Sequence, residues 1–156
     1  MDPIGIAAPR TAWRLLGWLG WLLLLVGGID LVSQWYPPAF KSPEWEFGVV
    51  TVTIASLPLL TIGSTAVLAS CLSRAKRGGV LMMGAFFALL FVVVGLMLVL
   101  FASDLPLAMR SPPGPALTAV KKAIARTLAM GVAYEIAYFV AAVTSFRYAF
   151  GRVKDA

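Results

Sequence analysis

The carboxyl group of Glu135 is the first candidate for chemistry in this sequence. Glu135 lies near the middle of an apolar segment at about 124–149, where a charged side chain is costly and its default interpretation is functional. A carboxyl at that depth can relay a proton or an ion, or contact a cation of a partner. The alternative, which we favour, is a structural glutamic acid that hydrogen-bonds Ser56 or Thr53, because desolvation favours the uncharged form at neutral pH.

No other residues form a recognised catalytic or metal-binding pattern. The chain contains no histidine and a single cysteine, Cys71, so it lacks the imidazole that most often holds haem, copper or zinc. It also lacks a GxSxG motif, a phosphate-binding loop and a pair of acids within one apolar segment. The sequence therefore predicts a protein that is not an enzyme and holds no cofactor or metal.

The apolar residues lie in four long runs, at about 13–35, 47–72, 80–102 and 124–149. Hydrophobic residues make up 60% of the chain and charged residues 13%, against roughly 45–50% and 25% in a soluble domain, and the mean hydropathy is +0.89. Each run supplies about 20 residues or more, enough to cross a hydrocarbon layer of about 30 Å. These runs predict an all-α integral membrane four-helix bundle that forms one domain, residues 1–156.

The basic residues predict that both ends of the chain are cytoplasmic. Eight of the 13 lysines and arginines flank the N-terminus, the second loop and the C-terminus, and the side with more basic residues is normally the cytoplasmic one. We therefore expect a multi-pass protein of the bacterial cytoplasmic (inner) membrane. The net charge of +6 does not indicate nucleic-acid binding, because the basic residues border the apolar runs.

The two outer loops contain proline-rich stretches. We expect Pro106 and residues 111–115 to be non-helical, and a fourth helix to begin after Pro115 outside the membrane and enter it without a break. In the first loop, Ser42 is a suitable N-cap with Pro43 at the first helical position. The aromatic residues of that loop leave open a docking role on the outer face.

Small residues fall on one face of three of the predicted helices and allow close helix packing. This face either closes a monomeric bundle or contacts another chain, a second copy included. Its members are Gly17, Gly20, Gly27 and Gly28 in the first helix, Gly84, Ala88 and Gly95 in the third, and Gly131 and Ala142 with Glu135 and Tyr138 in the fourth.

Opposite charges gather at the outer membrane surface in the predicted topology. We expect them to pair, at about 0–1 kcal/mol for each exposed pair. For Asp30 we favour pairing with Lys121 or Arg126 over capping the helix or reaching the interface. The alternative is that the basic residues bind lipid phosphates or an acidic partner. This outer-face charge cluster comprises Asp30, Glu44, Glu46, Lys121, Lys122 and Arg126.

The segment Tyr36–Phe47, with Pro-Glu-Trp-Glu-Phe after an aromatic-Pro step, resembles small four-helix proteins of bacteria and cyanobacteria. Among these is the HpsJ-like group, in which a similar aromatic-Pro…Asn-Pro-Glu-Trp segment joins the first two spans. Ser42 replaces that asparagine here. The resemblance implies an accessory membrane protein without catalytic residues.

Short loops, small-residue faces and the absence of catalytic motifs together predict a non-enzymatic accessory or assembly subunit of a larger membrane complex. It would act through helix–helix and outer-face contacts with other membrane subunits or with itself, surrounded by lipid and without nucleic acid. The alternative function is a small proton-coupled carrier or channel that uses Glu135.

Overall fold

Four helices make up the protein, as a computed structural model shows for residues 10–36, 38, 42–110 and 115–151. Within those ranges the side chains of Pro43, Glu44, Glu46, Leu107, Ala108, Pro115 and Ala116 are not described. The predicted all-α fold of four helices is confirmed, and each helix is long and apolar enough to cross a membrane. The helices are α1 (Arg10–Gln34), α2 (Pro43–Ser73), α3 (Arg77–Ala108) and α4 (Pro115–Gly151).

Local sequence signals set the ends of α2. Ser42 is its N-cap, with the Ser42 hydroxyl accepting from the Trp45 N–H at 3.5 Å and proline at the first position, as predicted. At the other end the Lys76 N–H donates to the Cys71 carbonyl and the Ala75 N–H to that of Leu72, both at 3.0 Å. This is a Schellman turn, and Ala75 adopts its left-handed position with φ 51°. The α2–α3 connection is therefore short and hydrogen-bonded.

The prediction for Pro106 is wrong, because α3 continues through it to Ala108. Proline removes one helical hydrogen bond, here the one to the Ala102 carbonyl four residues earlier. So close to the helix end, that single loss is tolerated, and the Met109 N–H bonds the Leu105 carbonyl at 3.1 Å. Pro115 is the first residue of α4, a position that needs no N–H donor. Residues 111–114 lie outside the described part of the chain.

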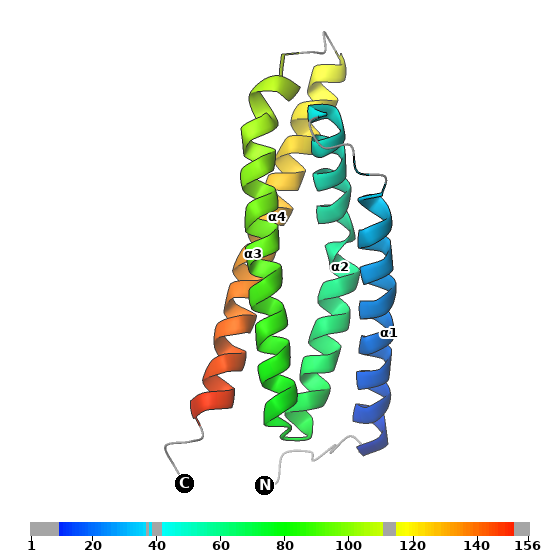
Figure 1. Cartoon of the computed structure of the whole chain (residues 1–156), viewed down its shortest axis with the longest axis vertical. Helices are drawn as coiled ribbons and strands as arrows, with labels where there is room; N and C mark the ends of the chain where they lie inside the picture. Colours follow the sequence, from blue (N-terminus) through cyan, green and yellow to red (C-terminus); the bar gives the residue numbers. More distant parts are fainter. Residues whose placement is uncertain (1–9, 37, 39–41, 111–114, 152–156) are drawn as a thin grey trace, which may run out of the picture.

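The helices run up and down, and the start of α1 and the end of α4 lie at the end of the molecule that also carries the α2–α3 turn (Figure 1). Helix α2 is central: it packs against each of the other three helices, and α3 also packs along α4. In the described part of the chain no Cα atom of α1 lies within 8 Å of α3 or α4. Helix α1 is therefore attached through α2 alone.

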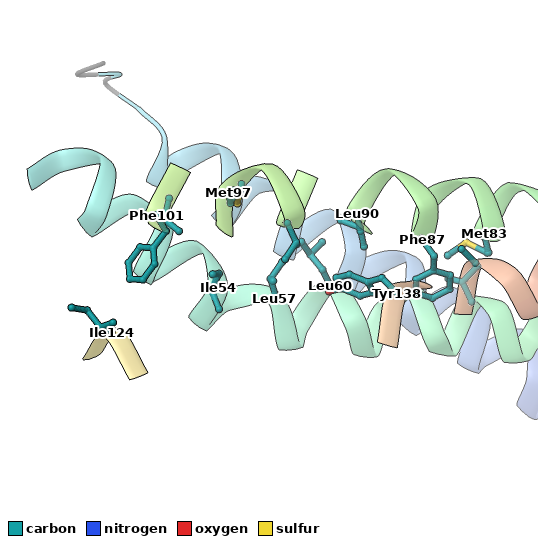
Figure 2. Packing of buried hydrophobic residues seen from close by; sticks show 14 residues of the cluster. Ile54, Leu57, Leu60, Met83, Phe87, Leu90, Met97, Phe101, Ile124 and Tyr138 are labelled. Carbon is teal, nitrogen blue, oxygen red and sulfur yellow. The ribbon is translucent and has the colours of Figure 1, made fainter. Parts of the chain in front are cut away.

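The hydrophobic core lies between α2, α3 and α4 (Figure 2). Its central side chains are almost fully buried, among them Ile54, Leu57, Phe87, Phe101 and Tyr138. Phe47 stacks on Phe101 with ring centroids 4.8 Å apart. From α1, only Leu24 and Leu31 pack against this core, both partly buried.

Candidate functional site

Three glycines of α1 form its contact with α2. A Cβ atom added at Gly20 would lie 2.8 Å from the Gly63 carbonyl oxygen and 2.9 Å from the Val67 nitrogen, both backbone atoms. A Cβ at Gly17 would meet the Ser70 hydroxyl at 2.6 Å, and one at Gly27 would meet the Leu60 side chain at 2.9 Å. The two backbones touch because these positions carry no side chain.

Gly28 does not belong to this contact, although the sequence grouped it with the other three glycines. A Cβ at Gly28 would have no atom within 4 Å, because one residue turns a helix by about 100°. Gly63 of α2, which we did not single out from the sequence, takes its place: a Cβ there would lie 2.9 Å from the Gly20 carbonyl oxygen.

A polar network joins the end of α1 to the first half of α2. The Gln34 amide donates to the Asp30 carboxylate at 2.9 Å, and the Trp35 indole donates to the Thr53 hydroxyl at 3.2 Å. The Thr53 hydroxyl donates to the Gln34 amide oxygen at 3.5 Å, and Thr53 is fully buried. Gln34 connects this network. We did not single it out from the sequence, where the only indication of its role is that an amide lies next to the end of an apolar run.

The α3–α4 interface also depends on glycines, but their neighbours are side chains. A Cβ at Gly84 would lie 3.0 Å from the Ser145 Cβ, and one at Gly131 would lie 2.5 Å from a methyl group of Leu98. A Cβ at Gly95 would lie 2.5 Å from the Glu135 Oε1. Gly95 therefore leaves the room that the Glu135 carboxyl group occupies.

The predicted hydrogen bond from Glu135 to Ser56 or Thr53 is wrong. The Glu135 Oε2 is buried and has no hydrogen-bond partner among the described residues. The Ser56 hydroxyl instead bonds the Thr53 carbonyl at 2.9 Å, and Thr53 bonds residues of α1. We predicted this contact only because the three residues lie at a similar depth in the predicted membrane. In the structure Glu135 faces α3, whereas the hydroxyl groups of Ser56 and Thr53 face α1.

Tyr138 lies one turn from Glu135, and its hydroxyl, unlike the Glu135 Oε2, makes a hydrogen bond. Its hydroxyl lies 2.7 Å from that of Thr61, which itself donates to the Leu57 carbonyl at 2.9 Å. Thr61 has one hydroxyl hydrogen, so Tyr138 is the donor to it. The Tyr138 ring stacks on Tyr134 and lies 6.1 Å from the Phe87 ring. Tyr138 therefore links α4 to α2 across the core.

The structure does not bring the outer-face charge cluster together. Asp30 bonds Gln34 within α1, a helix that does not contact α4, so its predicted pairing with Lys121 or Arg126 is wrong. The side chains of Glu44 and Glu46 lie outside the described residues, and their pairing stays a prediction. Lys121, Lys122 and Arg126 are exposed, and the last two line a cavity of about 360 Å³ between α4 and α2.

The described residues contain no group of three or more His, Cys, Asp and Glu side chains that could hold a metal ion. Comparison with family models, with curated proteins and with solved structures finds no match for this chain. The described residues offer one half-buried carboxyl group, that of Glu135, whose buried Oε2 has no hydrogen-bond partner among them. They also offer one helix, α1, that is packed on a single side.

Proposed function

We propose that this chain is a multi-pass protein of the bacterial cytoplasmic membrane and a non-enzymatic accessory or assembly subunit of a larger membrane complex. The single observation that supports this function is the exposure of α1. Its only buried residues are Gly17, Gly20 and Gly27. Leu24 and Leu31 pack against the core, but most of the other apolar side chains of α1 are exposed.

A regular stripe follows the exposed side of α1. Six residues in heptad spacing are each 59–76% exposed: Leu15, Trp18, Leu22, Leu25, Ile29 and Val32. This spacing suits a second helix packed with a small left-handed crossing angle. We define these six residues as the α1 stripe. We infer that a partner's transmembrane helix covers Leu15, Leu22, Leu25 and Ile29, the members that do not line the spaces between α1 and α3.

Site-specific photo-cross-linking in native membranes tests the subunit function. A photoreactive residue at Leu22 should give one discrete adduct with another polypeptide. The same residue at Ile136, which is 61% exposed on α4, is the matched control and should react with lipid. Equal labelling at the two positions, without a polypeptide adduct, would contradict the subunit function. An adduct between two copies of this chain would replace it with self-association.

The proposed orientation places both termini in the cytoplasm. Arg14 lies near the start of α1, Arg74 and Lys76 in the α2–α3 turn, and Arg147 near the end of α4. These helix ends lie together (Figure 1), and the positive-inside rule favours basic residues on the cytoplasmic side. Single cysteines introduced at Ser42 or at Ala156, in a Cys71→Ser background, should differ in their reactivity with an impermeant thiol reagent in intact cells. Labelling at Ser42 alone is expected, and labelling at Ala156 alone would reverse the orientation.

A second function, a small proton-coupled carrier, draws on the unpartnered Oε2 of Glu135. A carboxyl group without a partner in the membrane is free to exchange a proton. Proteoliposomes with a pH-sensitive dye inside would detect proton flux, and Glu135→Gln should abolish it. Flux that is equal in the wild type, in Glu135→Gln and in empty vesicles would exclude this function.

A further inference from the structure

A basic cavity opens beside the α2–α3 turn, near the start of α1. It has a volume of about 550 Å³, lies between α1, α2 and α3, and is lined by Arg14, Arg74 and Lys76 together with Trp18 and Ser70. A neighbouring cavity of about 450 Å³ is lined by the same three basic residues and by Arg10. No acidic side chain is among the described residues that line either cavity.

The local structure fixes the backbone of all three basic residues. The Ser70 hydroxyl donates to the Trp13 carbonyl at 2.8 Å, which sets Arg14 beside the last turn of α2. Arg74 is the C-cap of α2. The Lys76 carbonyl accepts the first hydrogen bond of α3, from the Val80 N–H at 3.1 Å. Within the described part of the chain none of the three cations has an anionic partner. The cavity therefore concentrates positive charge that no described residue pairs.

An apolar groove continues from this cavity toward the middle of the molecule. It has a volume of about 420 Å³, and Trp21 and Met82 line both spaces. It runs between α1 and α3 over α2 as far as Val32, and Gly28 leaves it open. From Trp21 to Val32 the rise along α1 is about 16 Å, close to half of a hydrocarbon layer of about 30 Å.

We propose that this site binds one anionic phospholipid of the membrane. The phosphate lies among Arg14, Arg74 and Lys76, the indole of Trp18 is level with the glycerol esters, and one acyl chain lies in the groove. The order from basic to aromatic to apolar residues matches the order of groups along a phospholipid. Basic pockets between transmembrane helices on the cytoplasmic side are suited to anionic headgroups.

A transmembrane segment of another protein suits this site less well. Its apolar side chains would fill the groove, but they would leave three cations unpaired at the mouth of the cavity. A phospholipid supplies the anion and the hydrocarbon in one molecule. The proposal rests on the membrane location given above but not on the subunit function, since the purified chain alone tests it.

Native mass spectrometry of the full-length chain in detergent tests the site, with phosphatidylglycerol and phosphatidylcholine of the same acyl chains as probes. We expect one bound phosphatidylglycerol at concentrations that give no phosphatidylcholine adduct. Arg74→Gln with Lys76→Gln should weaken binding about 25-fold, since one basic residue near the surface contributes about fivefold. The matched control, Arg77→Gln with Arg147→Gln, removes equal charge near the same end from residues that line neither cavity.

Two glycine variants test whether an acyl chain lies in the groove. A Cβ at Gly28 or at Gly48 has no atom within 4 Å, but only Gly28 lines the groove. Gly28→Phe should weaken phosphatidylglycerol binding and Gly48→Phe should not. The loss should be only partial, because an acyl chain displaced from the groove remains in an apolar phase.

Cys71 gives a readout that needs no variant, because it lines the basic cavity. Phosphatidylglycerol should slow its reaction with a small thiol reagent, and phosphatidylcholine should not. Equal protection by the two lipids, or an equal loss of binding in both charge-removal variants, would overturn the proposal. Protection by water-soluble glycerol phosphate as strong as that by the lipid would show an anion site without a lipid and would also overturn it.

Discussion

The α1–α2 and α3–α4 interfaces use the same device, glycines that let two helices approach, but they differ in what the glycines meet. At α1–α2 the glycine at position 20 faces backbone atoms of α2, and hydrogen bonds close the interface near both ends. At α3–α4 the glycines face side chains, and Glu135 Oε2 and Ser145 Oγ are buried without partners in the described structure.

This difference separates a structural contact from a place where chemistry remains possible. A buried polar atom without a partner costs about 1–3 kcal/mol, so a purely structural interface gains by avoiding one. The α1–α2 contact includes satisfied polar groups, and we regard it as structural. The α3–α4 contact tolerates the cost at Glu135, which is why Glu135 carries our second candidate function.

The largest expected effect is at Gly20. Gly20→Leu would place side-chain atoms against the backbone of α2, which cannot move aside cheaply, and should lower the free energy of unfolding by about 3 kcal/mol. Intrinsic tryptophan fluorescence during thermal unfolding in detergent would measure it. Gly28→Leu on the same helix is the control and should change stability little. Equal losses in both variants would contradict the close backbone contact.

Replacing Glu135 with leucine should stabilise the protein, in contrast to the variant at Gly20. Glu135→Leu removes a buried oxygen without a partner and should raise the free energy of unfolding by about 1–2 kcal/mol. Glu135→Gln keeps a polar group there and should leave expression and melting temperature nearly unchanged. Destabilisation by Leu but not by Gln would show that the carboxyl group has a hydrogen-bond partner.

A smaller loss is expected in the polar network of α1 and α2. Gln34→Leu removes the partner of Asp30 and of Thr53, and hydrogen bonds between membrane helices are worth about 0.6 kcal/mol on average and up to about 1.7. The same thermal measurement applies, with Ser33→Ala as the control, because the Ser33 hydroxyl bonds only its own helix. A neutral Gln34→Leu would mean that the glycines alone hold α1.

The smallest effect is expected at Gly131. A Cβ there meets the Leu98 side chain, which can change its rotamer, and alanine is favoured over glycine in a helix by about 1 kcal/mol. The two effects oppose each other, so Gly131→Ala should change stability by less than about 1 kcal/mol. A loss as large as that of Gly20→Leu would remove the distinction between the two interfaces.

The sequence predicted the four helices and the N-cap of α2, because length, hydropathy and capping are local properties. It did not predict which helices touch. Asp30 and Glu135 were assigned partners by depth in the membrane, and depth does not specify the direction in which a side chain points. The prediction for Pro106 gave too much weight to proline, whose cost falls near a helix end. The role of Gly63 could not be predicted from the sequence, because it depends on where α1 packs against α2.

The attachment of α1 to α2 alone also has a consequence for how the protein is made. Every close contact of α1 is with the next helix along the chain, so the first hairpin is complete once Lys76 has been synthesised. Contacts between neighbours in sequence form fast, and helices that insert individually associate afterwards. We therefore expect the first hairpin to pack without help from α3 or α4, and α2 then serves as the template on which the second hairpin assembles.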